Sequence, residues 1–192
     1  MADDSTRNPI SVGHDPSQPE QNAETAPEET KTSNKEEKLS FLGFVGSYPH
    51  SIDAKGRMII PAAFRDALGE RFAVAPSPDF QAVALYPIAD WIARRDELAA
   101  IVRRKPVAQP ILDMFTKYSY TDCESDAQGR LLLPQKLRAW RLGDASQVDV
   151  NGAFSHIRVL PAETGRQQDL SFDEEFEDPL ALIAEIQRGG QF

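Results

Sequence analysis

One pattern of hydrophobic and polar positions occurs twice along the chain. The sequence DAKGRMIIP at 53–61 matches DAQGRLLLP at 126–134. The two copies stay aligned without a gap as far as Arg65 and Arg138. Each copy predicts a tight turn at the glycine, a short buried apolar strand, and a proline that opens a helix. The chain is therefore organised around an internal repeat.

Each repeat extends beyond this motif. We expect the helices to span 62–68 and 135–142, with the second one residue longer than the first. Gly69 and Gly143 follow them as stop signals. Because a unit this small buries little surface alone, the two copies are expected to pack together or against other chains. The strands expected after the helices are 71–75 and 82–87 in the first copy, and 147–150 and 155–161 in the second.

A helical hairpin is expected between the repeats. Apolar residues from 88 to 102 recur at helical spacing, and Asp90 and Arg94 are placed to form a weak ion pair within that helix. Pro106 and Pro110 interrupt the helix, and a second one is predicted to begin at Pro110. Apolar leading strands are expected before each turn, within 41–52 and 118–124.

Charge is distributed unevenly along the chain. Residues 1–40 contain nine acids and four bases, residues 163–192 contain eight acids and two bases, and the total formal charge is −9. The segment 41–162 is therefore weakly basic, at +2. The first 40 residues lack apolar periodicity and are expected to be disordered. At the other end, an acidic run at 173–178 precedes a short helix expected at 180–186 in a surface-docked or partly disordered tail.

The sequence offers little for catalysis. Cys123 is the single cysteine, which excludes a disulfide within the chain and suits a reducing cytoplasm. His50 and His156 are expected to be packed or surface residues rather than ligands. Lone glycines at the turns do not form a phosphate-binding loop. We therefore predict a protein that is not an enzyme and needs no cofactor, metal or small-molecule substrate, and that has no membrane-spanning segment.

Basic residues gather in and just after the two turns, where a guanidinium can reach a phosphate or a guanine edge. The alternative is that Asp53 pairs with Arg57, and Asp126 with Arg130, so that each pair locks its own turn. Both can hold together, because a partly paired arginine can still reach outward. The expected DNA-binding residues are Lys55, Arg57, Arg65, Arg130, Lys136 and Arg138. The expected turn-stabilising residues are Asp53, Gly56, Asp126 and Gly129.

With these motifs the chain resembles the MraZ family of bacterial transcriptional regulators. The resemblance rests on the doubled D-x-x-G-R pattern, the helical hairpin between the copies, HSID at 50–53 and VNG at 150–152. It implies an α+β fold, in which two pseudo-symmetric AbrB-like swapped-hairpin β-barrel halves are joined by the hairpin. It also implies a ring-shaped homo-oligomer in the cytoplasm, associated with the nucleoid. The implied partner is double-stranded DNA with repeated elements, in the promoter of the protein's own division and cell-wall gene cluster.

The resemblance, which covers roughly 41–162, and the composition of the two ends together divide the chain into five segments. An AbrB-like assembly or protein-interaction module without specific DNA binding remains the alternative, in which the basic turns would be buried or neutralised rather than lie on one open face. The segments are a disordered acidic leader at 1–40, an AbrB-like DNA-binding repeat at 45–92, a helical connector at 93–117, a second repeat at 118–161 and an acidic tail at 162–192.

Overall fold

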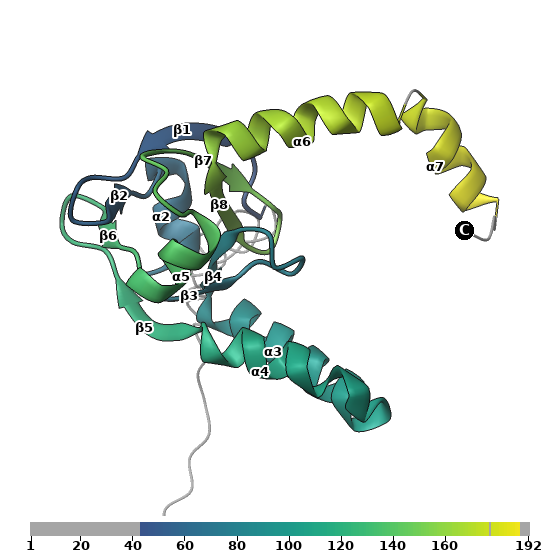
Figure 1. Cartoon of the computed structure of the whole chain (residues 1–192), viewed down its shortest axis with the longest axis horizontal. Coiled ribbons are helices and arrows are strands. Elements are labelled where there is room, and N and C mark those ends of the chain that lie inside the picture. Colours follow the sequence, from purple (N-terminus) through teal and green to yellow (C-terminus); the bar gives the residue numbers. More distant parts are fainter. Residues whose placement is uncertain (1–42, 177, 189–192) are drawn as a thin grey trace, which may run out of the picture.

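The computed structural model describes residues 43–176 and 178–188. The disordered leader expected at 1–40 lies outside the described residues. Within them the fold is α+β, with a six-stranded antiparallel sheet, a separate two-stranded ribbon, six α-helices and a short 3-10 helix. Figure 1 shows the ribbon at one end of the body, while the α3–α4 hairpin and α6 project from the other side.

The elements follow the repeat in order. The strands are β1 (Ser47–Ser51), β2 (Arg57–Ile59), β3 (Arg71–Pro76), β4 (Val83–Pro87), β5 (Tyr120–Glu124), β6 (Arg130–Leu132), β7 (Gln147–Gly152) and β8 (Ile157–Pro161). The helices are α2 (Ala62–Leu68), α3 (Ile88–Arg104), the 3-10 helix η1 (Pro106–Ala108), α4 (Gln109–Lys117), α5 (Gln135–Arg141), α6 (Ala162–Glu175) and α7 (Pro179–Gln187).

The helices of the two repeats are equally long, at seven residues each. α2 ends at Leu68, and its C-cap Gly69, with a φ of 83°, confirms the predicted stop signal. The extra residue expected in the second helix was wrong, because Leu142 serves as the C-cap of α5 rather than continuing it. The amides of both Leu142 and Gly143 donate to the carbonyl of Arg138, which closes the last turn.

The first strand of each repeat pairs with the other repeat. β1 is antiparallel to β7, and β5 is antiparallel to β3. The sheet order is β1-β7-β8-β4-β3-β5, so the equivalent strands β4 and β8 meet at its centre and β1 and β5 form its edges. β2 likewise pairs with its counterpart β6. The two copies therefore pack together, as predicted, but as one intertwined body.

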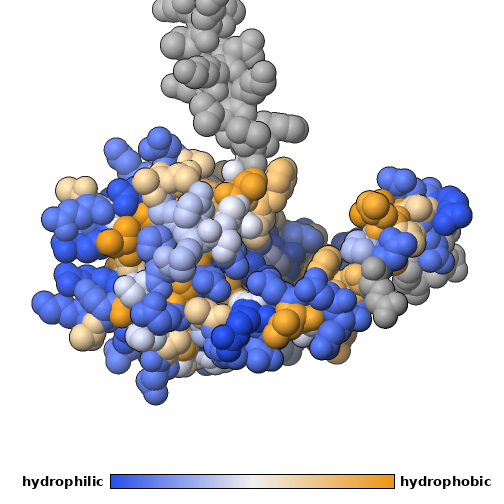
Figure 2. All heavy atoms as spheres, turned by 90° about the horizontal axis from the view of Figure 1, so that it is seen from above, coloured by the Kyte–Doolittle hydropathy of each residue, from blue (hydrophilic) through white to orange (hydrophobic). Residues whose placement is uncertain are grey.

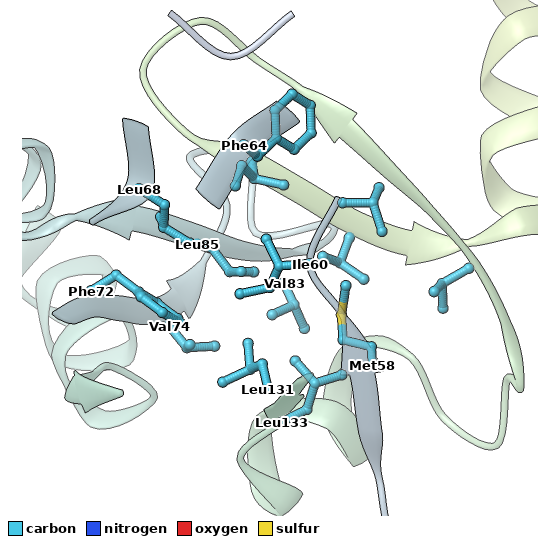
Figure 3. Packing of buried hydrophobic residues seen from close by; sticks show 14 of the residues in the cluster. Met58, Ile60, Phe64, Leu68, Phe72, Val74, Val83, Leu85, Leu131 and Leu133 are labelled. Atoms are coloured by element: carbon cyan, nitrogen blue, oxygen red, sulfur yellow. The ribbon is translucent and has the colours of Figure 1, made fainter. Parts of the chain in front are cut away.

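The main hydrophobic core draws on both repeats. Met58 and Leu131 point inward from the centres of the two ribbon strands and are 1% and 2% exposed. They pack with side chains from the helices and the sheet, including Phe64, Val74 and Leu85 (Figure 3). Because a single repeat supplies only part of this cluster, the core forms only when both copies come together.

A second, smaller cluster lies between the sheet and the α3–α4 hairpin. Alanines at 73, 75 and 84 give the sheet a flat surface, on which Leu98 of α3 and Phe115 of α4 are buried. Tyr86 is also buried there and donates from its hydroxyl to the carbonyl of Pro76, at 3.1 Å. The hairpin is thus confirmed as a part of the fold that packs on the first repeat. The expected ion pair between Asp90 and Arg94 does not form, because Arg94 pairs with Glu97 instead, at 2.7 Å.

The pseudo-symmetry continues further than the sequence indicated. α6 begins directly after β8 at Pro161, just as α3 begins directly after β4 at Pro87, and the two prolines have similar backbone angles. α7 confirms the helix expected in the tail, now with bounds of Pro179–Gln187. None of the helices in the described part of the chain combines the length and hydrophobicity needed to cross a bilayer.

The ribbon provides a matched test of the core. Leu131 is 2% exposed whereas its neighbour Leu132 is 62% exposed. Leu131→Ala should lower the free energy of unfolding by about 2–5 kcal/mol, because it leaves a cavity shared by both repeats. Leu132→Ala should lower it by less than about 1 kcal/mol. Urea denaturation of both variants checks this, and equal losses would contradict the inward and outward alternation.

Candidate nucleic-acid interface

The first turn is held by one carboxylate. Asp53 Oδ1 accepts hydrogen bonds from the backbone amides of Lys55 and Arg57, each at 2.9 Å. Asp53 Oδ2 accepts from Arg57 Nε at 2.8 Å and pairs with Nη2 at 2.7 Å. Gly56 adopts a φ of 83°, which favours glycine at this position. The turn and its arginine are therefore fixed together.

The second turn repeats this geometry. Asp126 Oδ1 accepts from the amides of Gln128 and Arg130, each at 2.9 Å, and Oδ2 accepts from Arg130 Nε at 2.7 Å. Gly129 has a φ of 76°. The structure thus contains the aspartate–arginine pair in both turns. The turns differ at one exposed position, where Lys55 in the first is replaced by Gln128 in the second.

Both carboxylates are stabilised in their charged form. The backbone amide of Arg57, followed by its side chain, lowers the pKa of Asp53 to about 2. The amide and side chain of Arg130 lower the pKa of Asp126 in the same way. The two turn locks therefore stay intact at neutral pH.

The ribbon presents one outward face between the turns. Arg57 lies opposite Leu132, and Ile59 lies opposite Arg130, so these four side chains share the face turned away from Met58 and Leu131. Further bonds, from the Ile60 amide to Gly129 and from the Leu133 amide to Gly56, extend the pairing into the turns. Arg57 and Arg130 are diagonal neighbours on this outward face. Diagonal neighbours on two paired strands lie roughly 7–8 Å apart.

The apolar triplets are not wholly buried, contrary to the sequence-based expectation. Ile59 and Leu132 are 45% and 62% exposed, because alternation along a strand turns the middle residue of each triplet outward. These two aliphatic residues were missed as candidate site residues. The period of two along the strand was the signal that could have identified them.

Two of the predicted arginines lie beneath the turns of the opposite repeat. The Arg138 guanidinium lies against Gly56 and the Arg65 guanidinium against Gly129, where a Cβ atom on either glycine would collide with it. Arg65 Nε also donates to the carbonyl of Ile60 at 2.9 Å. Each glycine thus leaves room for an arginine of the other repeat.

The remaining predicted residues also take defined places. Lys55 and Lys136 are exposed near the ribbon. His156, expected to be a packed or surface residue, is buried and stacks on Tyr86 with ring centroids 5.0 Å apart, and burial lowers its pKa to about 4. Within 43–176 and 178–188, the acidic, histidine and cysteine side chains form no cluster of three or more suited to a metal ion.

All of the predicted DNA-binding residues therefore converge on one end of the body. They come from the two turns, the ribbon and the helices α2 and α5, which Figure 1 places together at the left of the view. The same end is largely hydrophilic in Figure 2.

Comparison with known proteins now bears on this architecture. The family model described as "MraZ protein, putative antitoxin-like" matches residues 44–113, which include the first turn, α3 and the start of α4. A transcriptional regulator MraZ from Desulfitobacterium hafniense is 40% identical over 133 residues, covering 66% of this chain and 89% of that protein. Another from Desulforamulus reducens is 33% identical over 143 residues, covering 74% of this chain and 99% of that protein. The chain belongs to the MraZ family.

The turn lock of this MraZ family member can be tested by titration. In Arg57→Ala, the pKa of Asp53 should rise from about 2, because the side-chain bond is lost, but it should stay below the ordinary value of 3.8 because two backbone amides still donate. Carboxyl NMR of both proteins measures this shift. Because the folded pKa is lowered, the stabilisation is fully present above 3.8 and is lost as pH falls toward about 2.

The matched control is Arg130→Ala, which should leave the pKa of Asp53 unchanged because the side chain of Arg130 pairs with Asp126 rather than with Asp53. An unaltered Asp53 pKa in Arg57→Ala would show that the side-chain pair does not stabilise the charged carboxylate.

Proposed function

We propose that the chain is a sequence-specific DNA-binding transcriptional regulator without catalytic activity. The observation that carries this proposal is the outward face of the β2–β6 ribbon, where Arg57 and Arg130 are held in place by their aspartates. Two relatives that are 40% and 33% identical in sequence are named transcriptional regulators, which supports the same conclusion.

The arginine pairs favour recognition rather than prevent it. A guanidinium carries five N–H donors, and the aspartate engages the Nε side of each, at Nε and Nη2 in Arg57 and at Nε in Arg130. Each guanidinium carries further donors, and the two side chains are 35% and 36% exposed. Because the pair already fixes the rotamer, less conformational entropy is lost on binding. Each arginine can donate to guanine O6 and N7 or to a phosphate.

The aliphatic residues between the arginines complete the recognition surface. A two-stranded ribbon fits into the major groove, where the thymine methyl group offers an apolar contact. Ile59 and Leu132 are the side chains that the ribbon presents for such a contact. We propose that they read A·T pairs beside the bases read by the arginines.

The other basic residues add charge around the ribbon. Lys55 and Lys136 are exposed and are proposed to contact phosphates, which position the protein without reading sequence. Arg65 and Arg138 are proposed to raise the positive potential from beneath the turns. In this proposal, 45–92 and 118–161 act as the two DNA-binding repeats and 93–117 connects them.

The finer parts of the proposal follow from the family resemblance. The exchange of β1 and β5 supports a description of the repeats as AbrB-like swapped-hairpin halves. One subunit offers few contacts and carries a net charge of −9, so it should bind poorly by itself. We propose that a ring-shaped homo-oligomer binds repeated elements in the promoter of its own division and cell-wall gene cluster, in the cytoplasm and at the nucleoid.

The second candidate is an assembly or protein-interaction module. The exposed aliphatic pair Ile59 and Leu132 would also suit a protein contact. Under that alternative, the same face would bind a partner and show no preference among DNA sequences.

Substitution of the ribbon arginines separates these functions. Arg57→Ala and Arg130→Ala should each weaken DNA binding by roughly 1–3 kcal/mol, because each removes one set of base or phosphate contacts. Oligomer mass should be unchanged. The control is Arg95→Ala, which removes an exposed arginine that is paired with Asp96. Arg95 lies on α3 and belongs neither to the ribbon nor to its turns. Fluorescence anisotropy with upstream DNA of its own gene measures binding, and unchanged affinity in the double variant would refute the proposed interface.

The number and spacing of DNA elements should control affinity. DNA with several correctly spaced copies should bind roughly 10²–10⁴-fold more tightly than DNA with one copy, because later contacts become intramolecular. Shifting one copy by about 5 base pairs turns it to the opposite side of the helix and should remove much of this gain. Titrations of the three DNAs at two salt concentrations test this, and equal affinities would favour the assembly module.

A further inference from the structure

An open apolar groove lies beside the α3–α4 hairpin, away from the ribbon. Its volume is about 620 Å³, and it is bounded by the hairpin, the loop before β4 and α5. The side chains that form most of its wall are Phe80, Leu98, Ile101, Ile111, Met114 and Trp140. This is the kind of surface that receives an amphipathic helix.

Two arginines of the groove wall lack full partners. Arg141 stacks on Trp140 with its guanidinium carbon 3.4 Å from the ring centroid, but forms no hydrogen bond or ion pair within the described residues. The Nε atoms of Arg94 and Arg141 are both buried without a hydrogen-bond acceptor there. Because a guanidinium without an acidic partner attracts negative charge, the groove favours an apolar segment that also brings carboxylates.

The C-terminal helix α7 has this chemistry. Leu180, Ile183 and Ile186 lie at helical spacing on one side and are 77%, 49% and 53% exposed. α7 buries no residue, and the right-hand arm in Figure 2 shows hydrophobic side chains near its end. The sequence just before it, from 173 to 178, contains five acids. α7 is therefore an acidic-apolar segment without a packing partner among the described residues.

The helix at the position equivalent to α7 in the first repeat is α4, and its packing indicates how such a helix can bind. α7 follows α6 and β8 as α4 follows α3 and β4, and both α4 and α7 carry a proline in their first turn. α4 folds back and packs against α3, whereas α6 carries α7 away from the body (Figure 1). α6 has 14 residues and is thus roughly 21 Å long. In Figure 1, α7 lies at the end of α6, away from the α3–α4 hairpin of its own copy, where a second molecule can meet it.

We propose that α7 of one copy docks into the groove of a second copy of this chain. Its aliphatic face would contact Leu98, Ile111 and Met114, and the acidic residues before it would meet Arg94 and Arg141. Basic residues 103–105 at the end of α3 add to the attraction. Because the two surfaces in contact, α7 and the groove, are different, the contact joins copies head to tail. Such an assembly is closed only when the last copy meets the first. This contact does not involve the ribbon or DNA.

Disulfide crosslinking between copies tests the docking directly. In a Cys123→Ser background, one population carries Ile111→Cys in the groove, and a second, size-tagged population carries Ile183→Cys on α7. We expect oxidation of the mixture to produce a covalent species containing one chain of each size, because docking brings the two sulfurs within bonding range. The control replaces Ile111→Cys with Ile92→Cys, an α3 residue that is 39% exposed but does not line the groove.

Several outcomes would overturn the proposal. They are the absence of the mixed species, an equal yield with the Ile92→Cys control, and a crosslink that forms only within a chain carrying both Ile111→Cys and Ile183→Cys. The last result would place α7 in its own groove. None of these outcomes depends on whether the protein binds DNA.

A second measurement uses opposite faces of the same helix. Ile183→Glu should weaken self-association roughly 10–100-fold, because a charge would enter an apolar contact. Ala181→Glu places the same charge on the other side of α7, outside the row of exposed aliphatic residues, and should leave association unchanged. Sedimentation equilibrium gives both constants, and equal values for the two variants would overturn the docking contact.

Discussion

The main-chain pairing of β2 with β6 is the interaction on which the other features depend. It brings the two D-x-x-G-R turns side by side, points Met58 and Leu131 into a common core, and turns Arg57 and Arg130 to the outside. Strands of three residues would be weak by themselves. They persist because the buried side of the ribbon is packed by both repeats and its ends continue into locked turns. The proposed recognition face is thus the reverse side of the core.

Much of the local structure could be predicted from the sequence. Proline before α2 and glycine after it set that helix to within a residue, since both act through backbone geometry that depends only on neighbouring residues. The partners of the strands could not be predicted, because β1 and β5 have the same kind of pattern and either repeat could have accepted either strand. Placement beside the other repeat is decided by packing across the whole chain.

The candidate site was likewise predictable from the sequence only in its local features. The turn aspartates and arginines were recognisable, because their bonds span only four residues. Ile59 and Leu132 were taken as buried, since an apolar triplet does not reveal that one side of its ribbon is uncovered. The positions of Arg65 and Arg138 depend on contacts with the opposite repeat, and no local pattern contains that information. α6 was missed because its sequence is polar and gives little helical periodicity.

β1 and β5 each pair with a strand of the other repeat, so the two halves cannot be separated without breaking the sheet. A cut within the α3–α4 hairpin would yield two fragments, each with an edge strand whose hydrogen-bonding partner is on the other fragment. Neither would have a closed core or a glycine turn with its arginine in place. The two repeats therefore form a single folded unit rather than two separate domains. A change in one half alters the surroundings of the other, because each glycine turn packs against an arginine of the opposite repeat.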